Sequence, residues 1–158
     1  MPIQLRYKAA VTLVAAALVI TPLTAATASA APLPQCQSAT FRNVGGGWQV
    51  FVPDVWEDWS TTCNLRYGDL PHRDPKNPFG NPTQAIQALQ SNLNYCYGSK
   101  LSKDGLYGAK TRDAVKVVQG KLGLTKDGIY GPRTRSAMKW RMWNPSKKVW
   151  SQGCYDKL

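Results

Sequence analysis

Apolar residues recur at helical spacing in the second half of the chain. The first stretch has one apolar stripe, made of Ile86, Leu89 and Leu93. The second has a longer stripe, which ends at Gly123 and is made of Ala114, Val115, Val118 and Leu122. A third helix is expected from Pro132, because proline at a first helical position gives up no hydrogen bond. Three short amphipathic helices can bury their stripes only against one another, so the pattern predicts a mainly α fold, a three-helix bundle.

The second and third helices follow two copies of one sequence unit. The segment from Lys103 reads Lys-Asp-Gly-Leu-Tyr-Gly-Ala-Lys-Thr-Arg-Asp-Ala-Val. It returns 23 residues later, from Lys126, as Lys-Asp-Gly-Ile-Tyr-Gly-Pro-Arg-Thr-Arg-Ser-Ala-Met. In each copy the Asp carboxylate can accept backbone N–H groups and the Gly tolerates a positive φ. Each copy is therefore expected to be a tight turn that leads into a helix.

Residues 31–81 have a different pattern. Three glycines precede the apolar-rich run Trp48–Val52, which we interpret as a strand, and Asn64–Tyr67 can supply a short partner strand. Several prolines then exclude regular structure and indicate a linker or an ordered irregular loop. They are Pro71, Pro75, Pro78 and Pro82. We expect 31–81 to be a small irregular and β appendage packed on the helices, with a separate miniature domain as the alternative.

The first 30 residues have the three-part pattern of a secretory signal peptide. Arg6 and Lys8 precede an apolar run from Ala9 to Ile20, and a small-residue segment ends at Ala30. Spanning a bilayer takes about 20 apolar residues, so this run is too short for a membrane anchor. We expect cleavage after Ala30 and a secreted, extracellular or wall-associated protein, with an uncleaved anchor as the alternative. The expected domains are thus 1–30, 31–81 and 82–158.

An even number of cysteines in an exported chain favours disulfides over free thiols. The four cysteines, Cys36, Cys63, Cys96 and Cys154, allow three pairings. We favour Cys36 with Cys63 and Cys96 with Cys154, because each bond then stays within one segment. Loop-closure entropy puts the contribution of the second bond at roughly 4 kcal/mol, which suits a small core.

Several spaced motifs together resemble those of a known family. They are Ile86-Gln-Ala-Leu-Gln-Ser-Asn-Leu-Asn, Asp104-Gly-Leu-Tyr-Gly, Thr111-Arg-Asp-Ala-Val-Lys-Val-Val-Gln, Gly123-Leu and Asp127-Gly-Ile-Tyr-Gly-Pro-Arg-Thr. In this order they look like the small three-helix peptidoglycan-binding domain found on many secreted cell-wall hydrolases of bacteria. The match covers about residues 82–142, and Val118 departs from it where the family usually has an aromatic residue. The resemblance implies a helical domain with a C-terminal extension in 82–158 and peptidoglycan as its ligand, and nothing in the match implies catalysis.

The resemblance also suggests a groove edged by the turns and the helix starts. The candidate ligand-binding residues are Tyr107, Thr111, Arg112, Tyr130, Arg133, Thr134 and Arg135. Their basic and aromatic groups would hold stem-peptide carboxylates and sugar faces. Two alternatives stay open: the tyrosines can cover the core, and the threonines can cap their helices.

Charge adds a second class of partner. Residues 31–81 hold four Lys or Arg against five Asp or Glu, a net charge of −1, whereas 82–158 hold fourteen against four, a net charge of +10. A basic exported domain is attracted to polyanions, so teichoic acid is a further expected partner beside peptidoglycan. For any single lysine, a solvated helix face is the simpler explanation.

Tryptophans interleaved with basic residues are also typical of proteins that bind nucleic acid. The residues concerned are Trp140, Arg141, Trp143, Lys147, Lys148 and Trp150. Export and the lack of a recognised motif argue against that reading, so we expect no nucleic acid partner, and we expect a monomer. Trp140 is expected to pack inward from the third helix, while Trp143 and Trp150 are freer to face solvent.

The chain shows no constellation for metal or covalent catalysis. A zinc site needs several ligands, and the sequence has one histidine, His72. The even cysteine count argues against a free thiol for a Cys and His dyad, and no Gly-x-Ser-x-Gly turn is present. We therefore expect no catalytic residue, no metal and no cofactor.

Two alternative functions remain. Asp54, Glu57 and Asp58 form the only cluster with the paired carboxylates that a glycosidase needs, and on a helical turn they would share a face. A minimal cell-wall glycan hydrolase with Glu57 as its acid is one alternative. A secreted inhibitor or effector is the other, with the loop around Trp56 and Trp59 as its contact with another protein.

Overall fold

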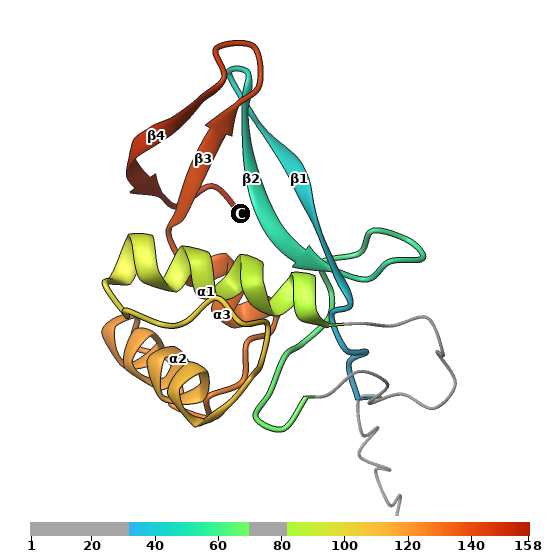
Figure 1. Ribbon diagram of the computed structural model, residues 1–158, viewed down its shortest axis with the longest axis vertical. Helices are drawn as coiled ribbons and strands as arrows, with labels where there is room; N and C mark the ends of the chain where they lie inside the picture. The colour runs from blue at the N-terminus through green and yellow to red at the C-terminus, as the bar shows by residue number, and fades with distance from the viewer. Residues whose placement is uncertain (1–31, 70–81) are drawn as a thin grey trace, which may run out of the picture. The chain divides into compact units, whose positions relative to one another are not determined.

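Four antiparallel strands form one sheet in the order β1-β2-β3-β4 (Figure 1). The computed structural model describes residues 32–69 and 82–158. Its strands are β1 (Ser38–Gly45), β2 (Trp48–Asp54), β3 (Trp140–Asn144) and β4 (Val149–Tyr155). β1 and β2 form one hairpin and β3 and β4 form another, and Gln49 and Val50 of β2 pair with Trp143 and Met142 of β3. The sheet therefore joins two hairpins from opposite ends of the described chain.

Three helices lie between the two hairpins in the sequence. They are α1 (Thr83–Tyr97), α2 (Ala109–Lys121) and α3 (Pro132–Ala137). Pro132 is the first residue of α3, as predicted, and Pro82 and Gly108 are the N-caps of α1 and α2. The helix predicted to end at Gly123 ends two residues earlier, and Gly123 has a φ of 69°. The end of α3 was not placed correctly, because this helix ends at Ala137, before Trp140, which was expected to belong to it.

The core lies between α1 and the sheet rather than among the helices alone. Ile86, Leu89 and Leu93 of α1 are fully buried, together with Val50 and Val52 of β2. Figure 1 shows α1 between the sheet and α2, in agreement with its contacts to β1, β2, β3 and α2. The apolar stripe of the first helix was thus predicted correctly, but much of its partner surface is β structure.

The predicted mainly α three-helix bundle is wrong. The fold is α+β, with a four-stranded sheet and three short helices. The error began at Trp140, which is buried as expected but belongs to a strand. In β3 burial alternates from residue to residue, because side chains of a strand point to opposite faces in turn.

The strand predicted at Trp48–Val52 exists, but its predicted partner is wrong. β2 pairs with β1, where Phe41 lies opposite Phe51. Asn64 and Leu65 instead form isolated bridges, to Gln35 and Tyr130 respectively. Residues 64–67 therefore do not form a strand of this sheet.

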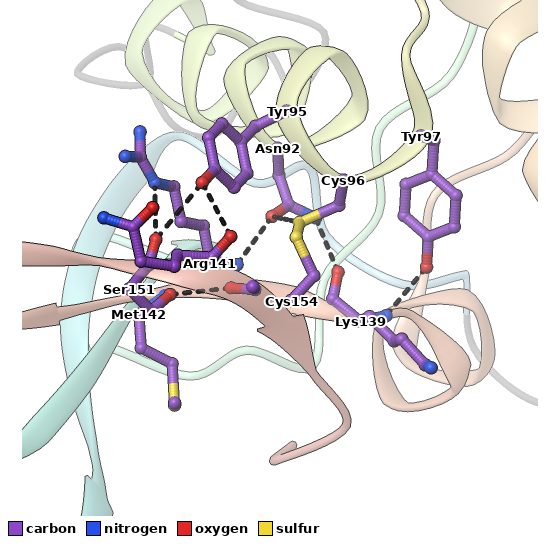
Figure 2. The surroundings of a disulfide bond; sticks show 11 residues. Asn92, Tyr95, Cys96, Tyr97, Lys139, Arg141, Met142, Ser151 and Cys154 are labelled. Carbon is purple, nitrogen blue, oxygen red and sulfur yellow. Dashed lines mark hydrogen bonds between the residues drawn. A yellow bond between two sulfur atoms is a disulfide. The ribbon is translucent and has the colours of Figure 1, made fainter.

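The favoured disulfide pairing is confirmed. Cys36 bonds to Cys63 with a Cα–Cα distance of 5.1 Å, and Cys96 bonds to Cys154 with a Cα–Cα distance of 5.8 Å. The second bond joins the last turn of α1 to β4 (Figure 2). It therefore fixes a helix to the strand at one edge of the sheet.

Some predictions fall outside the described residues. These are the signal peptide at 1–30, the prolines at 71, 75 and 78, and His72. Within 32–69 and 82–158, no helix is long and apolar enough to cross a membrane.

Candidate functional site

A buried glutamine of α1 holds the first copy of the repeat. Gln90 donates from Nε2 to Asp104 Oδ1 at 2.9 Å, to the Leu106 carbonyl at 3.1 Å and to Thr111 Oγ1 at 3.2 Å. Its Oε1 accepts the Gly105 N–H at 3.1 Å. The amide side chain is thus fully used inside the protein, as a buried polar group requires.

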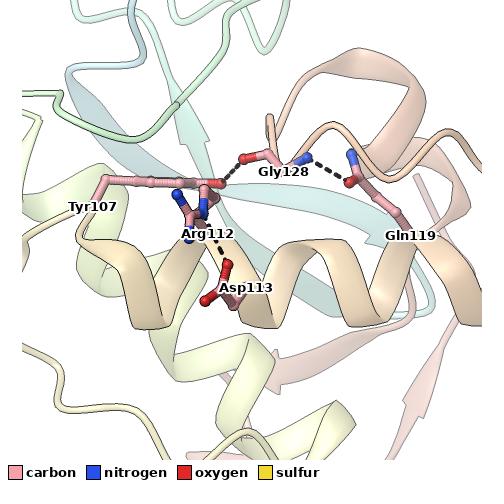
Figure 3. Close-up of polar contacts among 5 residues, drawn as sticks. All are labelled: Tyr107, Arg112, Asp113, Gln119 and Gly128. Atoms are coloured by element: carbon pink, nitrogen blue, oxygen red, sulfur yellow. Dashed lines mark hydrogen bonds and ion pairs between the residues drawn. The ribbon is translucent and has the colours of Figure 1, made fainter.

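The second copy is held by Gln119 of α2 in the same way. Its Nε2 donates to Asp127 Oδ1 at 2.7 Å, to the Ile129 carbonyl at 3.0 Å and to Thr134 Oγ1 at 3.1 Å. Its Oε1 accepts the Gly128 N–H at 2.9 Å, a bond drawn in Figure 3. The sequence repeat is therefore a repeated hydrogen-bond network in which a helix secures the turn that follows it.

The two Asp-Gly turns have the predicted conformation. Asp104 Oδ1 accepts the Leu106 N–H at 2.9 Å, and Gly105 has a φ of 74°. Asp127 and Gly128 repeat this, with a bond of 2.8 Å from Ile129 and a φ of 73°. The hydrogen bond from Gln90 and that from the Leu106 backbone lower the pKa of Asp104. Both aspartates are thus explained by turn geometry.

A hollow lies beside each turn. The first has a volume of about 220 Å³ and the second about 50 Å³. Five of the residues that line the first have counterparts 23 positions later that line the second. They are Leu101, Ser102, Asp104, Lys110 and Thr111 in the first hollow, and Leu124, Thr125, Asp127, Arg133 and Thr134 in the second. These equivalent hollows lie at the turns and helix starts, where a groove was expected.

Four of the seven candidate residues are buried. The exposed fractions of Tyr107, Thr111, Tyr130 and Thr134 are 2%, 3%, 1% and 4%. The Tyr107 hydroxyl donates to the Gly128 carbonyl at 2.9 Å and so links the two copies (Figure 3). Burial raises the pKa of both tyrosines far above the usual value, so both rings stay neutral. The tyrosines cover the core, which was one of the two roles left open.

The threonines act as internal bridges. Thr111 Oγ1 accepts from Gln90 and donates to the Leu106 carbonyl at 3.3 Å. Thr134 Oγ1 does the same with Gln119 and the Ile129 carbonyl. Neither caps its helix, because the N-caps are Gly108 and Gly131 without a side-chain bond.

The three candidate arginines differ in how freely they can reach a ligand. Arg112 donates to Asp113 Oδ1 at 2.8 Å (Figure 3). Its guanidinium also lies over the Tyr67 ring, 5.0 Å from the ring centre. Arg135 donates to the carbonyl and the hydroxyl of Thr61. Arg133 is exposed and lines the second hollow, where no other charged side chain except Asp127 contributes. Arg133 is therefore the candidate best placed to meet a ligand.

Lys110 was missed as a candidate. It is exposed, lines the first hollow and occupies the position that Arg133 has in the second copy. The repeat itself carried this signal, since aligning its copies places Lys110 opposite Arg133.

The acidic cluster does not form the helical turn that would put its members on one face. Asp54 ends β2 and is 0% exposed, whereas Glu57 and Asp58 are exposed in the turn that follows. Burial raises the pKa of Asp54, while Ser38 and Arg42 oppose the shift. The structure therefore does not place these carboxylates together as an acid and base pair facing a cleft.

Trp56 and Trp59 lie in the same exposed turn. Their exposed fractions are 58% and 46%, and their ring centroids are 5.4 Å apart. Among the residues that the structure describes, no group of three or more His, Cys, Asp or Glu is arranged to hold a metal ion.

The protein thus contains two copies of one structural unit. In each copy a buried glutamine holds a turn, the turn leads into a helix, and an exposed cation lines the hollow beside the turn. Residues 82–138 match the sequence model of the family described as "Putative peptidoglycan binding domain". The match falls on the stretch whose motifs resemble that family.

One solved structure is similar to this chain. It is a peptidoglycan-binding protein from Clostridioides difficile in complex with glutamine hydroxamate. The two are 28% identical with a TM-score of 0.41, over 61% of this chain and 54% of that chain. The chain thus spans about half the length of that relative. No curated protein matches the chain.

Proposed function

We propose that this protein is a secreted, non-catalytic peptidoglycan-binding protein. The observation that carries the proposal is the match of residues 82–138 to the peptidoglycan-binding family model. Two disulfides support an oxidising, extracellular or wall-associated location, because disulfides persist there. The proposal includes removal of residues 1–30 as a signal peptide.

The binding groups we propose are the exposed cations at the two turn hollows. Lys110 and Arg133 would attract the carboxylates of peptidoglycan stem peptides, and the clamped turns hold these cations on rigid supports. Arg112 and Arg135 carry internal bonds and would act more weakly. Teichoic acid would be attracted by the overall positive charge alone.

Co-sedimentation tests this proposal. Oxidised protein of residues 31–158 is mixed with purified sacculi, with and without teichoic acid, at low and at high salt. We expect depletion from the supernatant that survives high salt and the removal of teichoic acid, since a specific site is screened less than diffuse charge.

A charge-matched pair of variants locates the site. Lys110→Met with Arg133→Met is expected to weaken retention about tenfold, as for loss of charge-assisted hydrogen bonds. Lys121→Met with Lys157→Met removes the same charge from exposed positions outside both hollows and is expected to change little. Equal loss in both variants would mean that net charge alone drives binding. A fall in sacculus turbidity with the parent protein would overturn the non-catalytic part of the proposal.

A further inference from the structure

A separate groove lies between α1 and the sheet. It has a volume of about 270 Å³, and its lining includes Tyr95 of α1, Phe51 of β2, Arg141 of β3 and Trp150 of β4. Phe51, Arg141 and Trp150 lie outside residues 82–138, so the family match does not assign this groove. It shares no lining residue with either turn hollow.

An aromatic strip crosses all four strands and ends in this groove. Phe41 and Phe51 are directly paired, with ring centroids 4.9 Å apart, and Trp143 and Trp150 are paired with centroids 5.3 Å apart. Phe41 and Trp150, from the two edge strands, are 6.3 Å apart. Tyr95 on the facing helix is 43% exposed and Trp150 is 38% exposed. A soluble surface seldom leaves so many rings together and uncovered without a ligand.

The groove is also positively charged. The Arg141 guanidinium lies 3.8 Å from the centre of the Tyr95 ring and 5.3 Å from that of Trp150. Lys103 also lines the groove, and no Asp or Glu does. Arg141 Nε donates to the Ser151 carbonyl at 3.3 Å (Figure 2). Across the described ranges, no hydrogen-bond acceptor is found for its two Nη groups. Those Nη groups are therefore free to bind an anion.

The walls of the groove are fixed before any ligand arrives. The disulfide between Cys96 and Cys154 joins α1 to β4, and the Tyr95 hydroxyl donates to the Ser151 carbonyl at 3.2 Å (Figure 2). Asn92 of α1 donates to the Lys139 carbonyl at 3.0 Å and accepts the Arg141 N–H at 3.2 Å. A site held in this way loses little conformational entropy on binding.

We propose that this groove binds an anionic oligosaccharide. Sugar rings would lie on the exposed faces of Trp150 and Tyr95, because the apolar faces of sugars pack on aromatic rings. A carboxylate on the sugar would accept hydrogen bonds from Arg141 and Lys103. The inference rests on the proposed function only in taking cell-wall glycan as the source of that ligand. The lactyl carboxylates are free on strands from which the stem peptide has been removed, so such peptide-free strands are the expected ligand.

Calorimetric titration of the oxidised protein, residues 31–158, tests the proposal. The probes are peptide-free glycan strands of alternating N-acetylglucosamine and N-acetylmuramic acid, a neutral chitin oligosaccharide, free stem peptide, and teichoic acid. We expect the acidic glycan to bind about tenfold more tightly than the neutral one, the effect of a charge-assisted hydrogen bond. Equal affinity for both glycans, or preference for teichoic acid, would overturn the proposal.

Variants place the binding in the groove. Trp150→Ala is expected to weaken glycan binding about tenfold, as loss of a stacking platform does elsewhere. Lys103→Met is expected to reduce the preference for the acidic glycan; its side chain is exposed, so the fold stays intact. Trp56→Ala and Lys121→Met, both exposed and outside the groove, are the controls and are expected to bind as the parent does. Unchanged binding in both groove variants would refute the assignment.

The outcome is separable from that of the proposed function. Sacculus retention that depends on Lys110 and Arg133, with no binding of peptide-free glycan, would overturn the groove and leave the proposed function standing. Glycan binding that needs Trp150, without retention on sacculi, would support the groove and overturn the proposed function.

Discussion

One buried glutamine holds the turn of each repeat copy in place. Gln90 and Gln119 each make four hydrogen bonds to the turn and helix start that follow them. Their partners include backbone groups that are otherwise buried, so each glutamine supports groups that are costly to leave unpaired. The repeat motif was visible in the sequence, but the glutamine lies outside each copy and at a different distance from it.

Replacing Gln119 therefore has a large expected cost. Gln119→Leu removes the acceptor of the buried Gly128 N–H and the donor to Asp127 and Thr134. We expect a loss of about 3 kcal/mol in the free energy of unfolding, measured by denaturant titration. Gln84→Leu, at an exposed position of α1, is the matched control and should change stability by less than about 0.5 kcal/mol.

Comparing Gly105 with Gly98 separates the cost of a left-handed backbone conformation from the cost of a steric clash. Its φ is 74°, and an added Cβ would collide with the Thr83 side chain. Gly98 has a similar φ of 69°, but nothing lies near its Cβ position. Gly98→Ala is expected to cost about 1 kcal/mol from the left-handed backbone alone, and Gly105→Ala about 2 to 4 kcal/mol because overpacking adds to it. Equal melting temperatures for the two variants would contradict the predicted clash.

Asp54 makes stability depend on pH. Burial raises its pKa in the folded protein above the ordinary value of 3.8. The folded state then holds the proton more tightly, so this residue contributes stability at low pH that is lost as the pH rises through the folded pKa. Asp54→Asn cannot ionise. We expect the melting temperature of this variant, relative to that of the parent, to increase between about pH 3 and about pH 7, because only the parent loses this contribution.

At the scale of elements, local signals placed the starts of the helices but did not predict the sheet. Proline and glycine mark where helices start and stop through the conformations they allow, which needs no distant partner. Strand pairing is different, because β2 meets β3 across about 90 residues of intervening chain and only the folded core brings them together. The alternation in Trp140–Asn144 was short and directly followed a helix, so it was missed as a strand.

The disulfide between α1 and β4 is an element-scale device. Its cysteines are 58 residues apart. Closing this loop lowers the conformational entropy of the unfolded chain, which stabilises the folded state by roughly 4 kcal/mol. Replacing Cys96 and Cys154 by alanine is expected to lower the free energy of unfolding by up to that amount and to speed amide exchange in β4 first. Replacing Cys36 and Cys63, which are 27 residues apart, should leave exchange in β4 less affected. The reverse order would contradict this role.

At the scale of the molecule, the segment that matches the family model, residues 82–138, does not contain the whole hydrophobic core of the protein. Val50, Val52, Trp140 and Met142 are buried in the same cluster as the residues of α1, and all four lie outside 82–138. A fragment of residues 82–138 would expose the surface that these side chains cover. We expect it to unfold without cooperativity or at a much lower temperature, whereas residues 32–158 unfold in one transition by circular dichroism. A cooperative, equally stable fragment would show that the sheet is dispensable.

The sequence by itself determined the helix starts and the Asp-Gly turns, because both rest on local conformation, and it carried the spaced motifs of the family model that residues 82–138 match. The disulfide pairing was one favoured choice among three, which the structure settled. Only the tertiary structure decided which strands pair and which polar side chains point inward. Tyr107 and Thr111 were equally plausible at a surface, but a carbonyl of the other repeat copy and a glutamine of α1 hold their hydroxyls in the interior. Such contacts join residues 21 positions apart, a distance over which a local pattern carries no information.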